Sequence, residues 1–195
     1  MRGFPTISID VPWPMPRGFN GWGRRRVLPY RAMSLEAIAA IPVASVLRSE
    51  GYLLMWVPNV HLPNAFSILS AWRLAYRQTI TWCKEECAIG LGGIVASATE
   101  HVLVAQKIRP GTNAHGARTR RRRADKNWFV WPRTAHSAKP DEFYALVEHL
   151  LPGPYLDVFA RVPRPGWTCI GDEIDGLDVT EAIRRLAPAG AVSSA

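Results

Sequence analysis

The chain has 195 residues, of which 48% are hydrophobic, so it is long enough for one well-filled domain and too short for two of ordinary size. Its apolar stretches, such as 52-YLLMWV-57, are far shorter than the roughly 20 residues of a membrane helix, and no apolar segment follows Arg2 as it would in a signal peptide. Three cysteines, an odd number, argue against a disulfide framework and favour the reducing cytoplasm. We therefore expect a single domain over residues 1–180 and a C-terminal tail over 181–195.

Short apolar runs alternate with helical patterns along the chain. The expected strands cover residues 6–10, 52–57, 77–84, 101–108, 127–132, 155–161 and 167–171. The expected helices cover residues 34–51, interrupted by Pro42, 63–74 and 140–153. Strands that alternate with helices and are apolar on both faces predict an α/β fold, with a mostly parallel sheet covered by helices on both sides. Ligands in such folds bind beyond the carboxyl ends of the strands, where Asp10, Asp157 and Asp172 fall.

The positive charge, a formal net +8, is concentrated in two arginine runs. Runs of like charge repel one another, so we expect a mobile loop over residues 109–126 whose arginines need an anionic partner. Nucleic acid is the favoured partner, because each neutralised phosphate releases counterions; the alternative is a loop that only increases solubility. The arginines concerned are Arg24, Arg25 and Arg26 in one run and Arg118, Arg120, Arg121, Arg122 and Arg123 in the other.

Two common kinds of binding site are not indicated. Neither glycine-rich phosphate-binding motif is present, since 90-GLGG-93 is a poor match and no helical pattern follows it. A nucleoside-type cofactor without a pyrophosphate is therefore favoured over NAD or ATP. Cys83, Cys87 and His101 are not followed by a second closely spaced pair of ligands, so no metal site is expected. The histidines His61, His101, His115 and His149 are interpreted as ordinary residues.

Four stretches, in their order along the chain, resemble the MT-A family of methyltransferases. They are 10-DVPW-13, 28-LPYRAMSLEAI-38, 136-HSAKPDEFY-144 and 155-YLDVFARVPRPGWTCIGDEID-175. The first corresponds to the family's D-P-P-W, the third to its H-S-x-K-P-[DE], and the last to its F-A-R, R-P-G-W and G-N-E elements. The family is named after the methyl-transferring subunit of the mRNA adenosine methyltransferase, and it also holds bacterial and phage adenine methyltransferases that act on DNA.

The resemblance implies a Rossmann-like sheet in which the acceptor motif precedes the cofactor motifs, a circularly rearranged order. It implies S-adenosylmethionine as cofactor and methyl transfer to the N6 amino group of adenine in nucleic acid. DNA is favoured because short members of the family look like phage or bacterial enzymes. The protein would then act in the cytoplasm of a bacterial or phage-infected cell. RNA methylation and a catalytically weak or inactive nucleic-acid-binding subunit are the alternatives, and a plain basic binding module ranks below them. A homodimer or a partner subunit is compatible with the sequence.

At the acceptor motif, the resemblance implies that the Asp10 carboxylate and the Val11 carbonyl accept hydrogen bonds from the adenine amine. The amine can then attack a sulfonium methyl group held in line. Pro12 belongs to the same motif, and Asp10 would also border the cofactor. Trp13 would stack on the target base, and Tyr30 would line its pocket unless it is a core aromatic. Val11 stands where the family usually has Pro, which removes the fixed φ of proline but keeps the carbonyl.

On the cofactor side, the resemblance implies that Lys139 pairs with the carboxylate of S-adenosylmethionine. Asp157 and Arg161 would hold its ribose hydroxyls, and Asp172 and Glu173 would reach its ribose or adenine. Lys139 could instead be a surface residue, and Arg161 could belong to a structural ion pair. Asp157 and Asp172 stand where the family usually has Glu and Asn, so weaker cofactor binding is expected.

Overall fold

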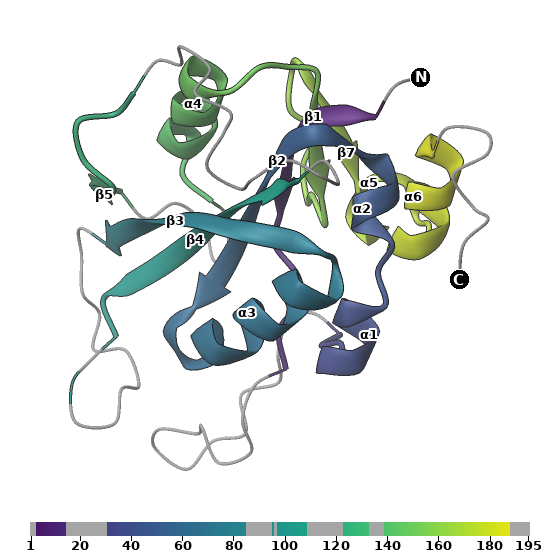
Figure 1. The fold of residues 1–195 in the computed structure, drawn as a ribbon, viewed down its shortest axis with the longest axis horizontal. Coiled ribbons are helices and arrows are strands. Elements are labelled where there is room, and N and C mark those ends of the chain that lie inside the picture. Colours follow the sequence, from purple (N-terminus) through teal and green to yellow (C-terminus); the bar gives the residue numbers. More distant parts are fainter. Residues whose placement is uncertain are drawn as a thin grey trace.

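The computed structural model of the chain describes residues 3–14, 31–84, 95, 97–108, 123–132 and 139–187 (Figure 1). Its strands are β1 (Phe4–Ile9), β2 (Leu47–Pro58), β3 (Leu74–Lys84), β4 (Thr99–Lys107), β5 (Trp128–Trp131), β6 (Tyr155–Val158) and β7 (Trp167–Ile170). Its helices are α1 (Leu35–Ala39), α2 (Val43–Val46), the 3-10 helix η1 (Asn59–His61), α3 (Leu62–Ala71), α4 (Asp141–Leu150), α5 (Asp172–Asp175) and α6 (Val179–Leu186). None of these helices is long and apolar enough to cross a bilayer.

The described strands form one sheet in the order β5-β3-β4-β2-β1-β6-β7. β1 pairs in parallel with β2 and β6, β6 with β7, and β3 with β5, whereas β4 is antiparallel to its neighbours β2 and β3. The prediction of a mostly parallel sheet is confirmed, because β4 alone among these strands is reversed. The carboxyl ends of the parallel strands therefore share one edge with the amino end of β4, and this brings Glu100 to that edge.

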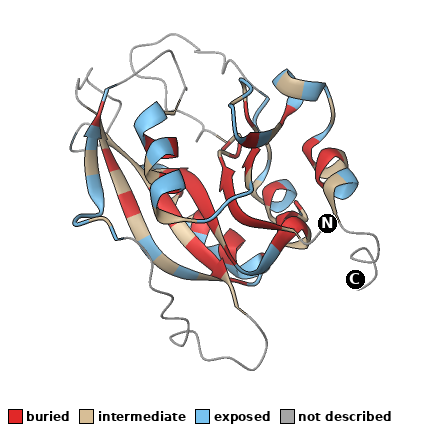
Figure 2. Cartoon of the chain, turned by 90° about the horizontal axis from the view of Figure 1, so that it is seen from above, coloured by how far each residue is buried: buried red, intermediate tan, exposed pale blue. Residues whose placement is uncertain are grey.

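Helices cover both faces of the sheet, as predicted. One hydrophobic core lies between the sheet and α1, α2, α3 and α6, and the other lies between the sheet and α4. β2 contributes to both: Leu53, Met55 and Val57 face the first core, and Leu54 and Trp56 face the second. This follows from the strand geometry, in which successive side chains point to opposite faces. Figure 2 shows the buried residues along the central strands and the exposed ones on the outer sides of the helices.

The segment 34–51, whose helical spacing Pro42 interrupts, forms two short helices and the start of a strand. Ser34 caps α1, since its hydroxyl accepts a hydrogen bond from the Ala37 N–H (3.1 Å), and Pro42 separates α1 from the short α2. β2 then begins at Leu47, which pairs with Phe4 of β1. Pairing with a strand that is distant in sequence outweighs the local helical spacing, which alone guided the prediction.

The C-terminal region contains the helices α5 and α6, which the sequence analysis does not predict. Asp178 caps α6, because its carboxylate accepts hydrogen bonds from two backbone N–H groups (2.9 and 3.3 Å). Val179, Ala182 and Ile183 of this helix are buried in the first core. The boundary expected between domain and tail at residue 181 therefore lies inside α6, and the folded domain continues at least to Leu186.

Candidate active site

Asp10 stands directly after β1, at the edge of the sheet where the parallel strands end. Its backbone N–H donates a hydrogen bond to the carbonyl of Val158, the last residue of β6 (3.3 Å), so Asp10 is fixed between two neighbouring strands. Its side chain is 27% exposed. The carboxylate is thus accessible beyond the strand ends, where the sequence predicts it.

Lys139, just ahead of α4, links Asp10 to Glu100. The Lys139 Nζ lies 3.2 Å from Asp10 Oδ2 and 3.0 Å from Glu100 Oε2, and the side chain is only 13% exposed. Lys84, the last residue of β3, lies on the other side of Glu100, with its Nζ 2.7 Å from Glu100 Oε1. The Lys139 Nζ also lies over the Trp56 ring, 4.6 Å from its centroid. Lys84, Glu100, Lys139 and Asp10, named here the charge network, alternate in sign along this row.

The alternation of charges governs the pKa values within the charge network. Burial opposes the ionisation of Glu100, but Lys139 and Lys84 outweigh it and hold the Glu100 pKa below its ordinary value. Burial also opposes the charge on Lys139, yet Asp10 and Glu100 raise its pKa. At Asp10 burial prevails over the attraction of Lys139, so the pKa of Asp10 is raised. A carboxylate with a raised pKa takes up a proton more readily than a solvated one.

The turn after Asp10 is held by backbone hydrogen bonds. The Trp13 N–H donates to the Val11 carbonyl (2.8 Å), and the Met33 N–H donates to the Pro12 carbonyl (2.9 Å). The Val11 carbonyl, predicted as the second acceptor for an amine, therefore already accepts one hydrogen bond and has a second lone pair. The Val11 side chain is buried in the first core, which accounts for an apolar residue at this position.

Trp13 does not form the open stacking surface that the sequence analysis expects. The residue is 3% exposed, and its indole N–H donates to the Trp56 carbonyl (3.0 Å). Its ring stacks on His61, with the ring centroids 4.9 Å apart. His61 in turn donates from Nε2 to the Pro14 carbonyl and accepts at Nδ1 from the Asn64 amide (3.1 Å). The expected role is therefore corrected: in this structure Trp13 anchors the turn, and His61 is a second anchor that the sequence analysis treats as ordinary.

Asp157 lies in β6 and is turned toward α4. The residue is 6% exposed, and its Oδ2 accepts a hydrogen bond from the Tyr144 hydroxyl (2.9 Å). Burial raises the pKa of Asp157 to about 6, although the hydrogen bond from Tyr144 works against this. Arg164 lies over the Tyr144 ring, 3.7 Å from its centroid, and binds Asp141 (2.6 Å). In this structure Asp157 is a buried carboxylate behind the site, and it is not the open ribose ligand that the sequence analysis expects.

Arg161 and Glu173 approach each other beyond the ends of β6 and β7, with the Arg161 Nε 3.9 Å from Glu173 Oε1. Asp172 opens α5 directly before Glu173. Arg161 is also close enough to Asp10 to lower its pKa, although burial is the stronger effect. The fold therefore brings three predicted cofactor residues to the edge that carries Asp10. The contact between Arg161 and Glu173 is compatible with both the cofactor role and the structural ion pair that the sequence leaves open.

The backbone at this edge is unusual in two places. β6 ends at Val158, earlier than predicted, because Phe159 turns the chain with φ 63°, a left-handed conformation that bulky residues rarely adopt. Gly171, directly after β7, lies against the Ala160 backbone, where a Cβ would come within 2.6 Å of the Ala160 carbonyl oxygen. The positive φ of Phe159 is strained backbone, which is often found at functional sites, whereas Gly171 is extended and is needed only for its close approach to Ala160.

The structure describes only one of the remaining residues that are predicted to contact the nucleic acid. Arg123 is described and exposed. The other predicted nucleic-acid contacts lie outside the described residues, namely Tyr30, Arg24, Arg25, Arg26, Arg118, Arg120, Arg121 and Arg122.

Glu100 and Lys84 are site residues that the sequence analysis does not select. Each is a single charged residue near the end of an apolar strand, which is a weak signal. The strands β3 and β4 run in opposite directions, and their pairing brings the end of one beside the start of the other. This antiparallel pairing could not be read from the local pattern.

Within the described parts of the chain, no group of three or more His, Cys, Asp or Glu side chains is arranged to hold a metal ion. His101 instead bridges two strands and a turn: its Nδ1 lies 3.1 Å from Thr81 Oγ1, and its Nε2 lies 2.8 Å from Asn59 Oδ1. Burial lowers the pKa of His101 although Glu100 opposes this, which favours the neutral ring.

Comparisons with known proteins all indicate the same family. The sequence profile of the MT-A70 family matches residues 4–173. The "N(6)-adenosine-methyltransferase MT-A70-like protein" of Drosophila melanogaster is 26% identical over 91% of this chain and 28% of its own length. The "N(6)-adenosine-methyltransferase catalytic subunit METTL3" of Homo sapiens is 24% identical over 97% of this chain and 32% of its own length. The "N6-methyladenosine RNA methyltransferase MTA1" of Cryphonectria parasitica is 28% identical over 88% of this chain and 52% of its own length. The chain thus spans 28% to 52% of the length of these relatives.

Proposed function

Because the chain belongs to the MT-A70 family, we propose that it transfers a methyl group to the N6 amino group of adenine in RNA. Methyltransferases of this family use S-adenosylmethionine as methyl donor, the cofactor that the sequence predicts. One relative is named as an RNA methyltransferase, and the others are named for adenosine. The preference for DNA in the sequence analysis finds no support among these relatives, so the RNA alternative replaces it.

The observation that carries the proposal is the Asp10 carboxylate, held at the strand edge by Lys139. An amine on an aromatic ring is a poor nucleophile, because its lone pair is delocalised into the ring. A carboxylate that accepts a hydrogen bond from the amine increases the electron density on the nitrogen. It can also take the proton that leaves when the new N–C bond forms, and the raised pKa of Asp10 suits it to this step. The Val11 carbonyl keeps a second lone pair, which would accept the other N–H.

The residues around Asp10 fit S-adenosylmethionine, which supplies an electrophilic methyl group on a sulfonium cation when it is bound. Arg161, Asp172 and Glu173 follow β6 and β7, where open α/β sheets bind nucleotide-like ligands. Their guanidinium and carboxylate groups can donate to and accept from ribose hydroxyls. Lys139 uses two of its three N–H donors on Asp10 and Glu100, so one donor remains for the predicted contact with the cofactor carboxylate.

The proposal is tested by methyl transfer from S-adenosylmethionine to RNA and DNA oligomers of matched sequence, followed by mass analysis of the nucleosides. We expect N6-methyladenosine in the RNA. Asp10→Asn should lower the rate about 10²- to 10³-fold, as expected when one preorganised polar contact to the transition state is lost. Glu181→Gln, which removes a carboxylate from an exposed ion pair on α6, is the control and should leave the rate unchanged.

Each other outcome has a definite meaning. Transfer to DNA but not to RNA would reverse the substrate assignment. An unchanged rate in Asp10→Asn would remove Asp10 from the reaction. Bound nucleic acid without any methyl transfer would identify the chain as the inactive subunit that the sequence analysis keeps as an alternative.

A further inference from the structure

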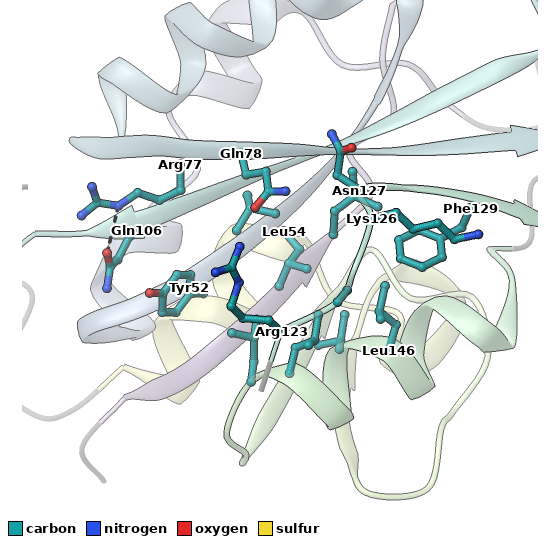
Figure 3. Close-up of a pocket in the computed structure, with 16 residues that line it drawn as sticks. Tyr52, Leu54, Arg77, Gln78, Gln106, Arg123, Lys126, Asn127, Phe129 and Leu146 are labelled. Carbon is teal, nitrogen blue, oxygen red and sulfur yellow. Dashed lines mark hydrogen bonds between the residues drawn. The ribbon is translucent and has the colours of Figure 1, made fainter. Parts of the chain in front are cut away.

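A cavity of about 410 Å³ lies between α4 and the sheet, and none of its described lining residues belongs to the charge network (Figure 3). It is lined by residues of β2, β3, β4 and α4 and by the segment 123–129. The charge network contacts β3 at its last residue, Lys84, whereas the cavity contacts it at Arg77, Gln78 and Ile80. The cavity volume falls in the range of about 300–1,000 Å³ that is typical of small-molecule sites.

The walls of the cavity are largely apolar. Leu146, Val147 and Leu150 of α4 form one side. Phe129 of β5 borders the cavity, and its ring is stacked on Trp131, with 4.9 Å between centroids and 10° between planes. An apolar wall beside an aromatic ring favours a flat ring system as ligand, because the faces of such a ring form no hydrogen bonds that would be lost on burial.

The charged side chains around the cavity are all cationic. Arg123, Lys126 and Arg77 line it, and none of its described lining residues is acidic. Arg77 is fixed by a hydrogen bond from its Nε to the Gln106 side chain (2.9 Å). In Figure 3 the Arg123 side chain extends into the cavity toward Gln78. The positive charges of Arg123 and Lys126 at this cavity favour an anionic group on the ligand.

The polar groups that line the cavity favour a nucleobase over an alkyl chain as ligand. Gln78 and Asn127 present side-chain amides at the cavity, and Asn127 is fixed by donating to the Thr79 carbonyl (3.0 Å). Amides carry both donors and acceptors and pair well with the edge of a base. An alkyl chain would bury these amides without new partners, which costs free energy.

We propose that this cavity is a second nucleotide pocket, which takes an unstacked base of the nucleic acid against Phe129 and its phosphate on Arg123. The inference rests on the proposed function, because it assigns part of the substrate's binding surface. It concerns a nucleotide other than the methylated adenine. RNA is commonly recognised through unstacked bases that stack on aromatic side chains and bind arginine, which is the chemistry present here.

Binding of uridine 5′-monophosphate to the full chain, measured by calorimetry, tests the proposal, because this nucleotide has no adenine for the acceptor site. Arg123→Gln should weaken its binding about tenfold or more through the loss of one charge-assisted contact. Leu146→Trp should fill the cavity and abolish binding while S-adenosylmethionine still binds. Arg184→Gln on α6, which removes the same charge from an exposed site, should have no effect.

Dodecanoate, an anionic molecule without a base, is titrated in parallel. Tighter binding of dodecanoate, with displacement of the nucleotide, would identify an amphiphile site and overturn the proposal. Equal nucleotide affinity in the wild type, Arg123→Gln and Leu146→Trp would also overturn it, even if RNA is methylated. Nucleotide binding that is lost in Leu146→Trp, together with absent methyl transfer, would uphold the pocket and reject only the proposed function. Since Leu146→Trp changes packing, its fold is checked by chemical unfolding, and the exposed Arg123→Gln variant gives an independent answer.

Discussion

Glu100 in the charge network and Asp157 in the pair with Tyr144 are carboxylates that this structure holds in opposite ways. In the charge network, Glu100 stands between Lys84 and Lys139, and its pKa is held below the ordinary value. Asp157 has a neutral phenol as hydrogen-bond donor, and burial raises its pKa to about 6. The difference shows that two lysines keep Glu100 charged at the open edge of this sheet, whereas burial favours the protonated forms of Asp10 and Asp157. Behind the edge, a negative charge opposes folding.

The sign of the pH dependence therefore differs between Glu100 and Asp157. Because the Glu100 pKa is depressed, its contribution to stability is present above the ordinary pKa and is lost as the pH falls through the folded-state value. The Asp157 pKa is raised from 3.8 to about 6, so its contribution is fully present below pH 3.8 and is lost as the pH rises through about 6. Acid should thus weaken the stabilising contribution of Glu100 and relieve the cost of the Asp157 charge.

The largest effect is expected from Lys139→Met, which breaks the charge network at its centre. Asp10 loses its ion-pair partner, and Glu100 keeps Lys84 alone. Removing one partner of a buried ion pair leaves an uncompensated charge, so the free energy of unfolding should fall by about 3–5 kcal/mol. Urea unfolding at pH 8 measures it. Cofactor affinity in the same variant tests whether Lys139 also binds the cofactor carboxylate.

Arg185→Met is the matched control for Lys139→Met, because Arg185 pairs with Glu181 on the exposed surface of α6. Exposed ion pairs one helical turn apart contribute about 0.3–0.5 kcal/mol to stability. We therefore expect little change in the free energy of unfolding. If Lys139→Met lowered the free energy of unfolding as little as the control does, this would contradict the role of Lys139 as the centre of the charge network.

A smaller effect, of opposite sign, is expected from Asp157→Asn. The amide keeps an oxygen acceptor for Tyr144 but carries no charge. Two pKa units correspond to about 3 kcal/mol, so this variant should be more stable than the wild type at pH 8 by up to that amount. The gain should shrink as the pH falls from 6 to 4. Unfolding free energies measured across this range provide the test, and a variant less stable than the wild type at pH 8 would show that Asp157 has an ionic partner.

The smallest effect is expected from Trp13→Phe, which loosens the support beneath the charge network. Phenylalanine keeps an aromatic ring for His61 but loses the N–H that donates to the Trp56 carbonyl, while Trp56 carries the Lys139 ammonium on its ring. The loss of one buried hydrogen bond should lower the free energy of unfolding by about 1 kcal/mol. Trp128→Phe, at an exposed ring, is the control and should change it less. Equal losses in the two variants would mean that the Trp13 hydrogen bond contributes nothing.

The candidate site could be predicted only in part, and the predicted part is local. The end of a strand at Asp10 follows from an apolar run that stops at Asp and Pro. The order of the family motifs is likewise visible in the sequence itself. Arg161, Asp172 and Glu173 fall after strands in the same way, and the shared direction of β1, β6 and β7 brings these strand ends to one edge.

What the sequence by itself determined is therefore the fold class, the family resemblance, and the residues that stand at strand ends. The tertiary structure alone decided which of them meet. Lys139 binds Glu100 because the antiparallel β4 starts at the edge where the parallel strands end, and no local spacing encodes that pairing. Trp13 is anchored by His61 and Trp56, and α6 forms because Asp178 caps it and Ile183 packs into the first core. Burial depends on neighbours far away in sequence, and for this reason it changed the expected roles of Trp13 and Asp157.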